Sequence, residues 1–198
     1  MTTSDNQVLK LPIVDANSEN IQPYGYLLGD DVSKPGLGNP FYQDRVIEGE
    51  NIDFSYRGRA TFRTAKIMPG YPEITWLERH IHMTQIFISL GQARFIMVLS
   101  PPNHKENKSL PDLSQAQAFR FPPGHGLLLH IGTWHDFPIA CDRPVVILTA
   151  NSDEVVTALT QMKEPGEMNQ GDVYKISLPK RRSEEPRLNS SHVKRSRM

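Results

Sequence analysis

Short apolar and β-branched runs, separated by proline and glycine, recur along the chain from about residue 60 onward. The runs are four to nine residues long and carry turn signals between them. This spacing is typical of an all-β sandwich or barrel. Seven runs predict strands: Ala60–Met68, Thr75–Glu78, Gln85–Leu90, Ala93–Ser100, Gln117–Phe121, Gly126–Ile131 and Val145–Asn151.

Helix signals are scarce, and the best one follows the last of these runs. Asp153 is a suitable N-cap residue, and apolar residues follow it at helical spacing as far as Met162. We therefore expect one short C-terminal helix and then a last strand at Asp172–Leu178. The polar, proline-containing segment Pro101–Ser114 is expected to be an exposed loop between barrel strands.

The two ends of the chain differ from the middle. Residues 1–45 are rich in turn residues and predict an N-terminal arm that packs on the barrel, with strands at Val8–Val14 and Tyr24–Leu28. Residues 46–179 are expected to form the barrel domain. Residues 180–198 are charged and lack a periodic apolar face, so they predict a disordered tail, which resembles a translated linker rather than native protein from about Glu185.

Composition and charge narrow the choice of partners and location. The 198 residues suffice for one domain with a core, and 22 basic and 22 acidic residues leave no basic excess for nucleic acid. No apolar run is long enough for a membrane helix, and the polar N-terminus does not predict a signal peptide. The single cysteine, Cys141, excludes an intrachain disulfide and favours a reducing compartment, which we expect to be the cytoplasm. The terminal Ser196-Arg197-Met198 is similar to a peroxisomal tripeptide, which is the alternative location.

Two polar clusters carry the candidate chemistry. His80 and His82 alternate along an extended segment, so we expect both on one strand face, with Gln85 three positions further on. A Gly-x-Gly turn at 124–126 precedes His130, which we expect within a few ångströms of the 80–82 pair in a shared concavity. Such a set suits a divalent metal (Ni, Mn, Fe or Zn), and without a metal it suits acid–base catalysis.

These clusters are similar to the two signature motifs of the cupin superfamily. Within that superfamily, the chain resembles the ureidoglycolate lyase family, also called ureidoglycolate hydrolase. The resemblance covers roughly residues 20–150. It is carried by Tyr24-Gly25, Leu77-Glu78-Arg79-His80 with Thr84-Gln85 and Phe87, Pro111-Asp112-Leu113-Ser114 with Ala118-Phe119, Gly124-x-Gly126 with His130, and Trp134-His135 before Pro138.

The resemblance implies a cupin-type jelly-roll β-barrel that forms a homodimer and acts on a small carboxylate. It implies cleavage of ureidoglycolate to glyoxylate and urea, a step of allantoin degradation in purine catabolism. The matched site candidates are Glu78, Arg79, His80, Gln85, His130 and His135.

The implied elimination needs a base for the hydroxyl proton, an acid for the leaving nitrogen and a cation for the substrate carboxylate. We assign acid–base catalysis to His80, His135 and Glu78, substrate binding to Arg79, Lys66 and Trp134, and metal chelation to His82, Gln85 and His130. Two alternatives stay open: a metal-dependent cupin dioxygenase or isomerase, and a cupin that binds a small acid without turnover.

Overall fold

The computed structural model describes residues 8–29, 45–70 and 73–184, together with positions 32, 36, 38 and 40–42. The C-terminal residues 185–198, which include the predicted linker-like tail and the terminal tripeptide, lie outside the described residues. No helix in the described part of the chain has the length and apolar character needed to cross a membrane.

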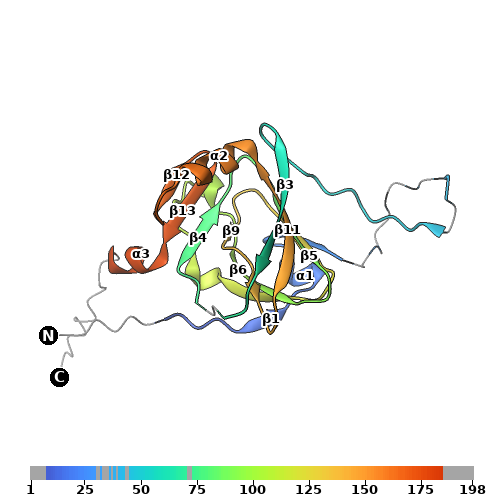
Figure 1. Ribbon diagram of the computed structural model, residues 1–198, viewed down its shortest axis with the longest axis horizontal. Coiled ribbons are helices and arrows are strands. Elements are labelled where there is room, and N and C mark those ends of the chain that lie inside the picture. The colour runs from blue at the N-terminus through green and yellow to red at the C-terminus, as the bar shows by residue number, and fades with distance from the viewer. Residues whose placement is uncertain are drawn as a thin grey trace, which may run out of the picture.

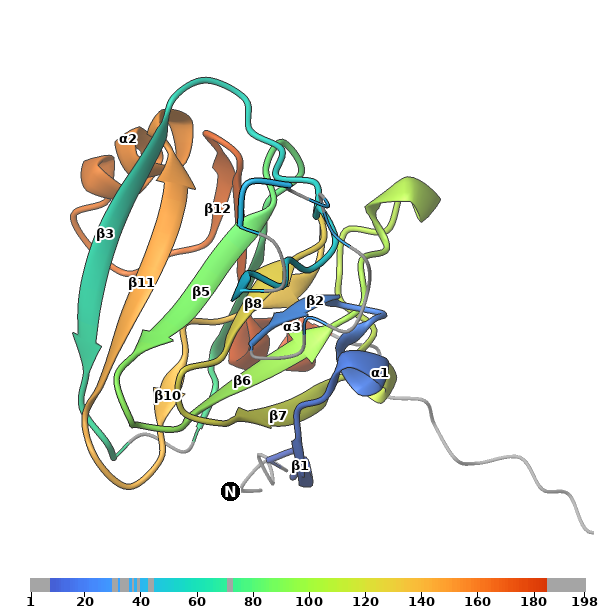
Figure 2. The ribbon, with the colours of Figure 1, turned by 90° about the vertical axis from the view of Figure 1, so that its right-hand side faces the viewer.

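Two β-sheets face each other across a shared core (Figure 1, Figure 2). Among these residues the larger sheet has the order β1 (Ile13–Asp15), β7 (Gln117–Phe121), β6 (Phe95–Ser100), β9 (Trp134–His135), β4 (Trp76–Arg79), β13 (Val173–Ser177) and β12 (Met168–Gln170), with β10 (Ile139–Ala140) beside β6. The second sheet has the order β2 (Gly25–Leu28), β8 (Gly126–Leu129), β5 (Gln85–Leu90), β11 (Val145–Ser152) and β3 (Ala60–Ile67). The predicted all-β barrel is confirmed.

The inner faces of the two sheets follow the two-residue period of a strand. In β5, for example, Gln85, Phe87 and Ser89 are buried, whereas the alternate positions are more exposed. The apolar part of the interior is a single cluster contributed by both sheets, with Phe87, Phe95, Met97, Leu99, Phe119, Phe121, Leu127, Leu129, Val145 and Ile147 among its members. Burial of this cluster supplies the main favourable free energy of folding.

The helices are short and lie outside the barrel. The α2 helix (Asp153–Gln161) confirms the predicted C-terminal helix, but its N-cap is Ser152, whose hydroxyl accepts from the backbone N–H of Val155 at 3.2 Å. Figure 1 shows α2 beside β12 and β13, where Val155 and Ala158 pack on Val173. The described part of the chain has two further α-helices, α1 (Ser18–Ile21) and α3 (Leu178–Glu184). Residues 180–184, expected in the disordered tail, therefore form the end of α3.

The described part of the N-terminal arm completes both sheets. Its first strand, β1, pairs with β7 in parallel, and β2 pairs antiparallel with β8. A capping box at Asn17 begins α1 between these strands, and Ile21 of α1 is fully buried in the core. The arm is thus part of the folded barrel.

A second, smaller core lies on the outer face of the larger sheet. Leu77 of β4, Trp134 of β9 and Ile176 of β13 pack together there. Because successive residues of a strand point to opposite faces, Glu78 and His135 point into the barrel. This arrangement puts polar side chains inside the barrel and apolar ones outside it at this end of the sheet.

Candidate active site

A tight bend, rather than a strand, carries the two histidines of the first motif. The prediction that His80 and His82 share one strand face is wrong, because residues 80–84 lie between the end of β4 and the start of β5. Asp172, in the turn between β12 and β13, fixes the bend: its Oδ1 accepts from the backbone N–H of Ile81 at 2.8 Å and of His82 at 3.1 Å. Asp172 itself adopts a left-handed conformation with φ of 56°.

Glu78, His80 and His135 form the cluster at the centre of the site. Each offers one ligand atom, and these atoms lie within 4.8 Å of one another. The exposed fractions of the three residues are 8, 3 and 1 %. Three ionisable side chains are therefore gathered in a buried position, where charges interact strongly.

Backbone carbonyls fix both imidazole rings. The Nδ1 of His80 lies 2.6 Å from the carbonyl oxygen of Asp172, and the Nδ1 of His135 lies 2.9 Å from that of Thr133. Because a carbonyl only accepts, each neutral ring carries its proton on Nδ1 and a lone pair on Nε2. The Nε2 of His80 is buried without a hydrogen-bond partner among the described residues. Burial lowers the pKa of His135 to about 4, so this ring is neutral at pH 7.

Lys175 balances the negative charge of the cluster. Its Nζ donates to Glu78 Oε2 at 3.1 Å and lies 3.7 Å from Asp136 Oδ1. Burial raises the pKa of Glu78, but Lys175 and the two imidazoles outweigh this effect, and the pKa falls below its usual value. Burial raises the pKa of Asp136, with Lys175 opposing the change. Lys175 and Asp136 were not among the predicted site residues, since nothing in the local sequence of β13 marks Lys175.

A chain of amide groups extends the site across the barrel to the second sheet. One end of the Gln85 amide lies 2.8 Å from His135 Nε2, and its other end lies 2.9 Å from the Asn151 amide. The Asn151 amide satisfies its neighbours when its oxygen accepts from Arg63 at 3.1 Å. Asn151 and Arg63 were not among the predicted site residues, although the strands that carry them were predicted.

The central cluster fits a divalent metal. Two imidazoles and one carboxylate are a ligand set that iron, nickel, manganese and zinc accept. Histidine ligands commonly donate their second ring N–H to a backbone carbonyl, as His80 and His135 do. The unpartnered Nε2 of His80 is a further sign that this position can hold a cation.

Comparison of the chain with known proteins identifies its family. The ureidoglycolate lyase family model matches residues 9–177, most of the chain. The chain belongs to the ureidoglycolate lyase family. A search of curated proteins finds no significant match. One solved structure with a detectable likeness is a dTDP sugar isomerase from Desulfovibrio desulfuricans G20, with 17 % identity over 77 % of this chain and 82 % of that chain and a TM-score of 0.39.

The three residues predicted to chelate a metal lie in separate environments in this member of the ureidoglycolate lyase family. Gln85 contacts His135, but His130 points to the other side of the second sheet. Leu129 pairs with Gln85 and lies in the core, so the next residue, His130, faces outward. Its Nε2 lies 3.0 Å from the carbonyl oxygen of Gln22, and its ring packs on Tyr26 with centroids 4.9 Å apart.

His82 belongs to a partly exposed ionic group beside the site. Its Nδ1 lies 3.3 Å from Asp172 Oδ1, and its Nε2 lies 3.2 Å from Arg57, which also pairs with Glu154. These contacts tie the bend at 80–84 to α2 and to the segment around Arg57. The structure therefore brings together Glu78, His80, His135 and Gln85, and it does not add His82 or His130 to them.

The residues predicted to bind the substrate also lie away from the cluster. Arg79 is enclosed between the rings of Trp134 and Tyr174, with its central guanidinium carbon 4.5 and 5.0 Å from their centroids. Its guanidinium donates to Asn103 Oδ1 and to the Lys108 carbonyl, both at 2.9 Å. Arg79 and Trp134 thus anchor the loop that follows β6. Lys66 is exposed on β3, on the face opposite to the core residue Ile67.

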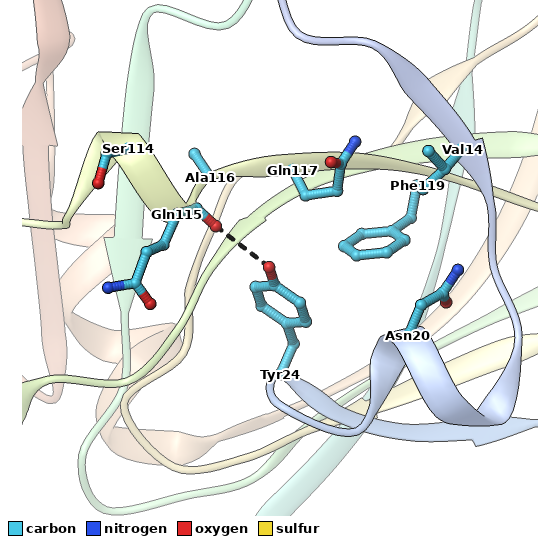
Figure 3. A pocket seen from close by; sticks show the side chains of 8 residues that line it. All are labelled: Val14, Asn20, Tyr24, Ser114, Gln115, Ala116, Gln117 and Phe119. Carbon is cyan, nitrogen blue, oxygen red and sulfur yellow. Dashed lines mark hydrogen bonds between the residues drawn. The ribbon is translucent and has the colours of Figure 1, made fainter.

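The early Tyr-Gly motif has a separate position from the histidine cluster. Tyr24 lines a hollow of about 470 Å³ between the N-terminal arm and β7, together with Gln115 and Phe119 (Figure 3). Its hydroxyl donates to the Gln115 carbonyl at 3.1 Å, and its ring meets Phe119 edge-on at 5.1 Å. Tyr24 therefore fastens the arm to the turn before β7.

Proposed function

We propose that this protein cleaves ureidoglycolate to glyoxylate and urea by elimination. The observation that carries the proposal is the buried cluster of Glu78, His80 and His135, in a chain of the ureidoglycolate lyase family. The Nε2 of His80 presents a free lone pair close to the Glu78 carboxylate and to His135, which is an arrangement that accepts either a proton or a metal ion.

The reaction moves one proton within the substrate and needs no net acid or base. The hydroxyl O–H bond breaks, the oxygen forms a C=O bond, the C–N bond breaks, and its electron pair stays on the urea nitrogen, which takes a proton. The free Nε2 of His80 is positioned to accept the hydroxyl proton and to return it to nitrogen. Glu78 stabilises the imidazolium that forms on the way.

A bound divalent metal would be held by Glu78, His80 and His135, and it would replace Gln85 at the Nε2 of His135. Such a metal would lower the pKa of the substrate hydroxyl and orient it. Lys175 is the cation that reaches the cluster from β13, and we propose that it interacts with the substrate carboxylate in place of the outward-facing Arg79 and Lys66. The homodimer and the cytoplasmic location stay predictions from the sequence.

The test is an assay for glyoxylate and urea released from ureidoglycolate, with and without chelator. The wild type is expected to release both products in equal amounts. His80→Ala is expected to lower kcat/KM at least 100-fold, because proton transfer by a positioned base contributes about that much. His125→Gln is the matched control, since this histidine lies on the turn before β8 and outside the cluster.

Two outcomes would redirect the assignment. Two histidines and one carboxylate also serve oxygen-dependent iron enzymes, so oxygen consumption without urea release would favour the dioxygenase alternative. Tight binding of a small acid without any product would favour the non-catalytic alternative. Absence of glyoxylate from metal-replete protein contradicts the proposed reaction.

A further inference from the structure

A buried hydroxyl without a partner marks the second-sheet side of the site. Thr149 has an exposed fraction of 0 %, and its Oγ1 has no hydrogen-bond partner in the part of the chain that the structure describes. Thr149 pairs with Phe87 on one side and Arg63 on the other. Because Phe87 belongs to the core, Thr149 points into the barrel, and Arg63 lies on the same face of the sheet but is exposed on β3. A buried hydroxyl costs free energy unless something hydrogen-bonds to it.

The side-chain amides of Asn151 and Gln85 can satisfy their hydrogen-bond partners in only one orientation. Arg63 has no acceptor, so it donates to the oxygen of Asn151, whose NH₂ group then faces Gln85 at 2.9 Å and the Ala150 carbonyl at 3.1 Å. Gln85 must accept with its oxygen and turn its own NH₂ group toward His135 Nε2. This nitrogen accepts, because the Nδ1 proton of His135 is bound to a carbonyl.

This arrangement leaves a defined set of groups for a ligand. Gln85 keeps one N–H and one oxygen lone pair, Asn151 keeps one oxygen lone pair, and the Thr149 hydroxyl is unused. Acceptors therefore outnumber donors at this corner of the barrel. A ureido group, with a single carbonyl and three N–H bonds, has the complementary excess of donors.

We infer that Gln85, Asn151 and Thr149 form the subsite that recognises the ureido group of the substrate. The inference rests on the proposed function. Gln85 contacts His135, so a ureido group attached to the reacting carbon lies against Gln85 when the hydroxyl lies at the imidazoles. Arg63 is a positioning residue, because it sets the direction of both amides without touching the cluster.

The decisive experiment compares two carbinolamides that both release glyoxylate. They are ureidoglycolate and N-acetyl-α-hydroxyglycine, in which a methyl group replaces the terminal NH₂. A site that hydrogen-bonds an NH₂ group discriminates strongly against an analogue that lacks it. We expect the wild type to prefer ureidoglycolate by at least 100-fold in kcat/KM. Thr149→Val is expected to lower kcat/KM for ureidoglycolate about 10-fold and to leave the acetyl compound within twofold.

Stability measurements separate this role from a structural one. Thr149→Val removes a hydroxyl without a partner, so its urea unfolding midpoint is expected to equal or exceed that of the wild type. Arg63→Met is expected to reduce the preference for ureidoglycolate about 10-fold, and Arg63→Lys is expected to restore part of it. Thr64→Val is the matched control, because Thr64 is exposed on the outer face of the same strand.

The outcomes distinguish the subsite from the reaction. No glyoxylate from either compound would overturn the proposed function. Glyoxylate from both compounds with equal kcat/KM, or equal losses for both in Thr149→Val, would overturn the ureido subsite and leave the reaction standing.

Discussion

At the scale of the residue, His135 makes stability depend on pH. Its pKa is about 4 in the folded protein, against about 6.5 in an unfolded chain. Between these values the unfolded chain binds a proton that the folded chain does not, so the free energy of unfolding decreases as pH falls through this window. The loss amounts to about 3 kcal/mol. Glu78, whose pKa is lowered, adds its own loss only in more acidic solution.

Urea unfolding of chelator-treated protein between pH 7 and pH 4 checks this expectation. His135→Gln removes the titrating group and keeps an amide that can contact Gln85. The variant should lose less stability than the wild type over the same interval. If the free energy of unfolding changes with pH in the same way in both proteins, the pKa of His135 is not lowered by folding.

The three residues of the central cluster and Gln85 were predicted from the sequence, but the orientation of the other predicted residues was not predictable. The local pattern of β4 favours Leu77 inside and Glu78 outside, yet the small outer core around Trp134 reverses this choice. β8 is buried along its whole length, so its apolar residues do not show which face meets the core. His130 was therefore assigned to the wrong face. It directly follows Leu129, which pairs with Gln85.

At the scale of the element, the bend at residues 80–84 depends on Asp172. Its side chain is 1 % exposed and accepts from two backbone N–H groups, and its carbonyl holds the ring of His80. Asp172→Ala leaves those N–H groups without their partner, which costs about 2 kcal/mol, and should lower kcat by loosening His80. Asp172→Asn keeps an acceptor oxygen and should recover most of both. Urea unfolding and steady-state kinetics measure the two effects. If Asp172→Ala has the stability and kcat of the wild type, Asp172 does not hold the bend or His80.

Asn103 holds the loop that follows β6. Its Oδ1 accepts from Arg79 at 2.9 Å and from the Trp134 indole at 3.0 Å, and its amide donates to the Leu110 carbonyl at 2.7 Å. Asn103→Leu should destabilise the fold by about 3 kcal/mol, because it leaves buried donors unpaired. Hydrogen exchange should accelerate at residues 104–112. Lys105→Ala, an exposed change in the same loop, is the control. Hydrogen-exchange protection in Asn103→Leu equal to that of the wild type would contradict the role of Asn103 in holding the loop.

Strand prediction succeeded where an element was long enough to show a pattern. β5 and β7 begin and end at the predicted residues, and β3 and β11 differ from the prediction by one residue. β9, β10 and β12 contain only two or three residues each and have no period to detect. They form because neighbouring strands offer them hydrogen bonds, which is information from the tertiary fold. β9 matters most, since it carries His135.

At the scale of the whole molecule, the barrel interior is divided into an apolar and a polar part. Phenylalanine and leucine side chains from both sheets fill one part, and their burial stabilises the fold. The other part holds Lys175, Glu78, His135, Gln85 and Asn151, which span the interior from β13 to β11. Most of the apolar burial is therefore separate from the cluster of Glu78, His80 and His135, and a ligand that binds this cluster only in the folded protein adds to stability by mass action.

This division predicts how metals affect stability. A metal that binds only the folded protein raises the free energy of unfolding by about 3 kcal/mol at a concentration of 100 times its Kd. Thermal unfolding with added nickel, manganese, iron or zinc should show the increase in the wild type. It should disappear in His80→Gln, which removes a ligand, and persist in His130→Gln, because His130 faces Gln22 on the outer surface. The reverse pattern would restore the ligand set predicted from the sequence, whereas no shift with any metal would favour acid–base elimination by the imidazoles alone.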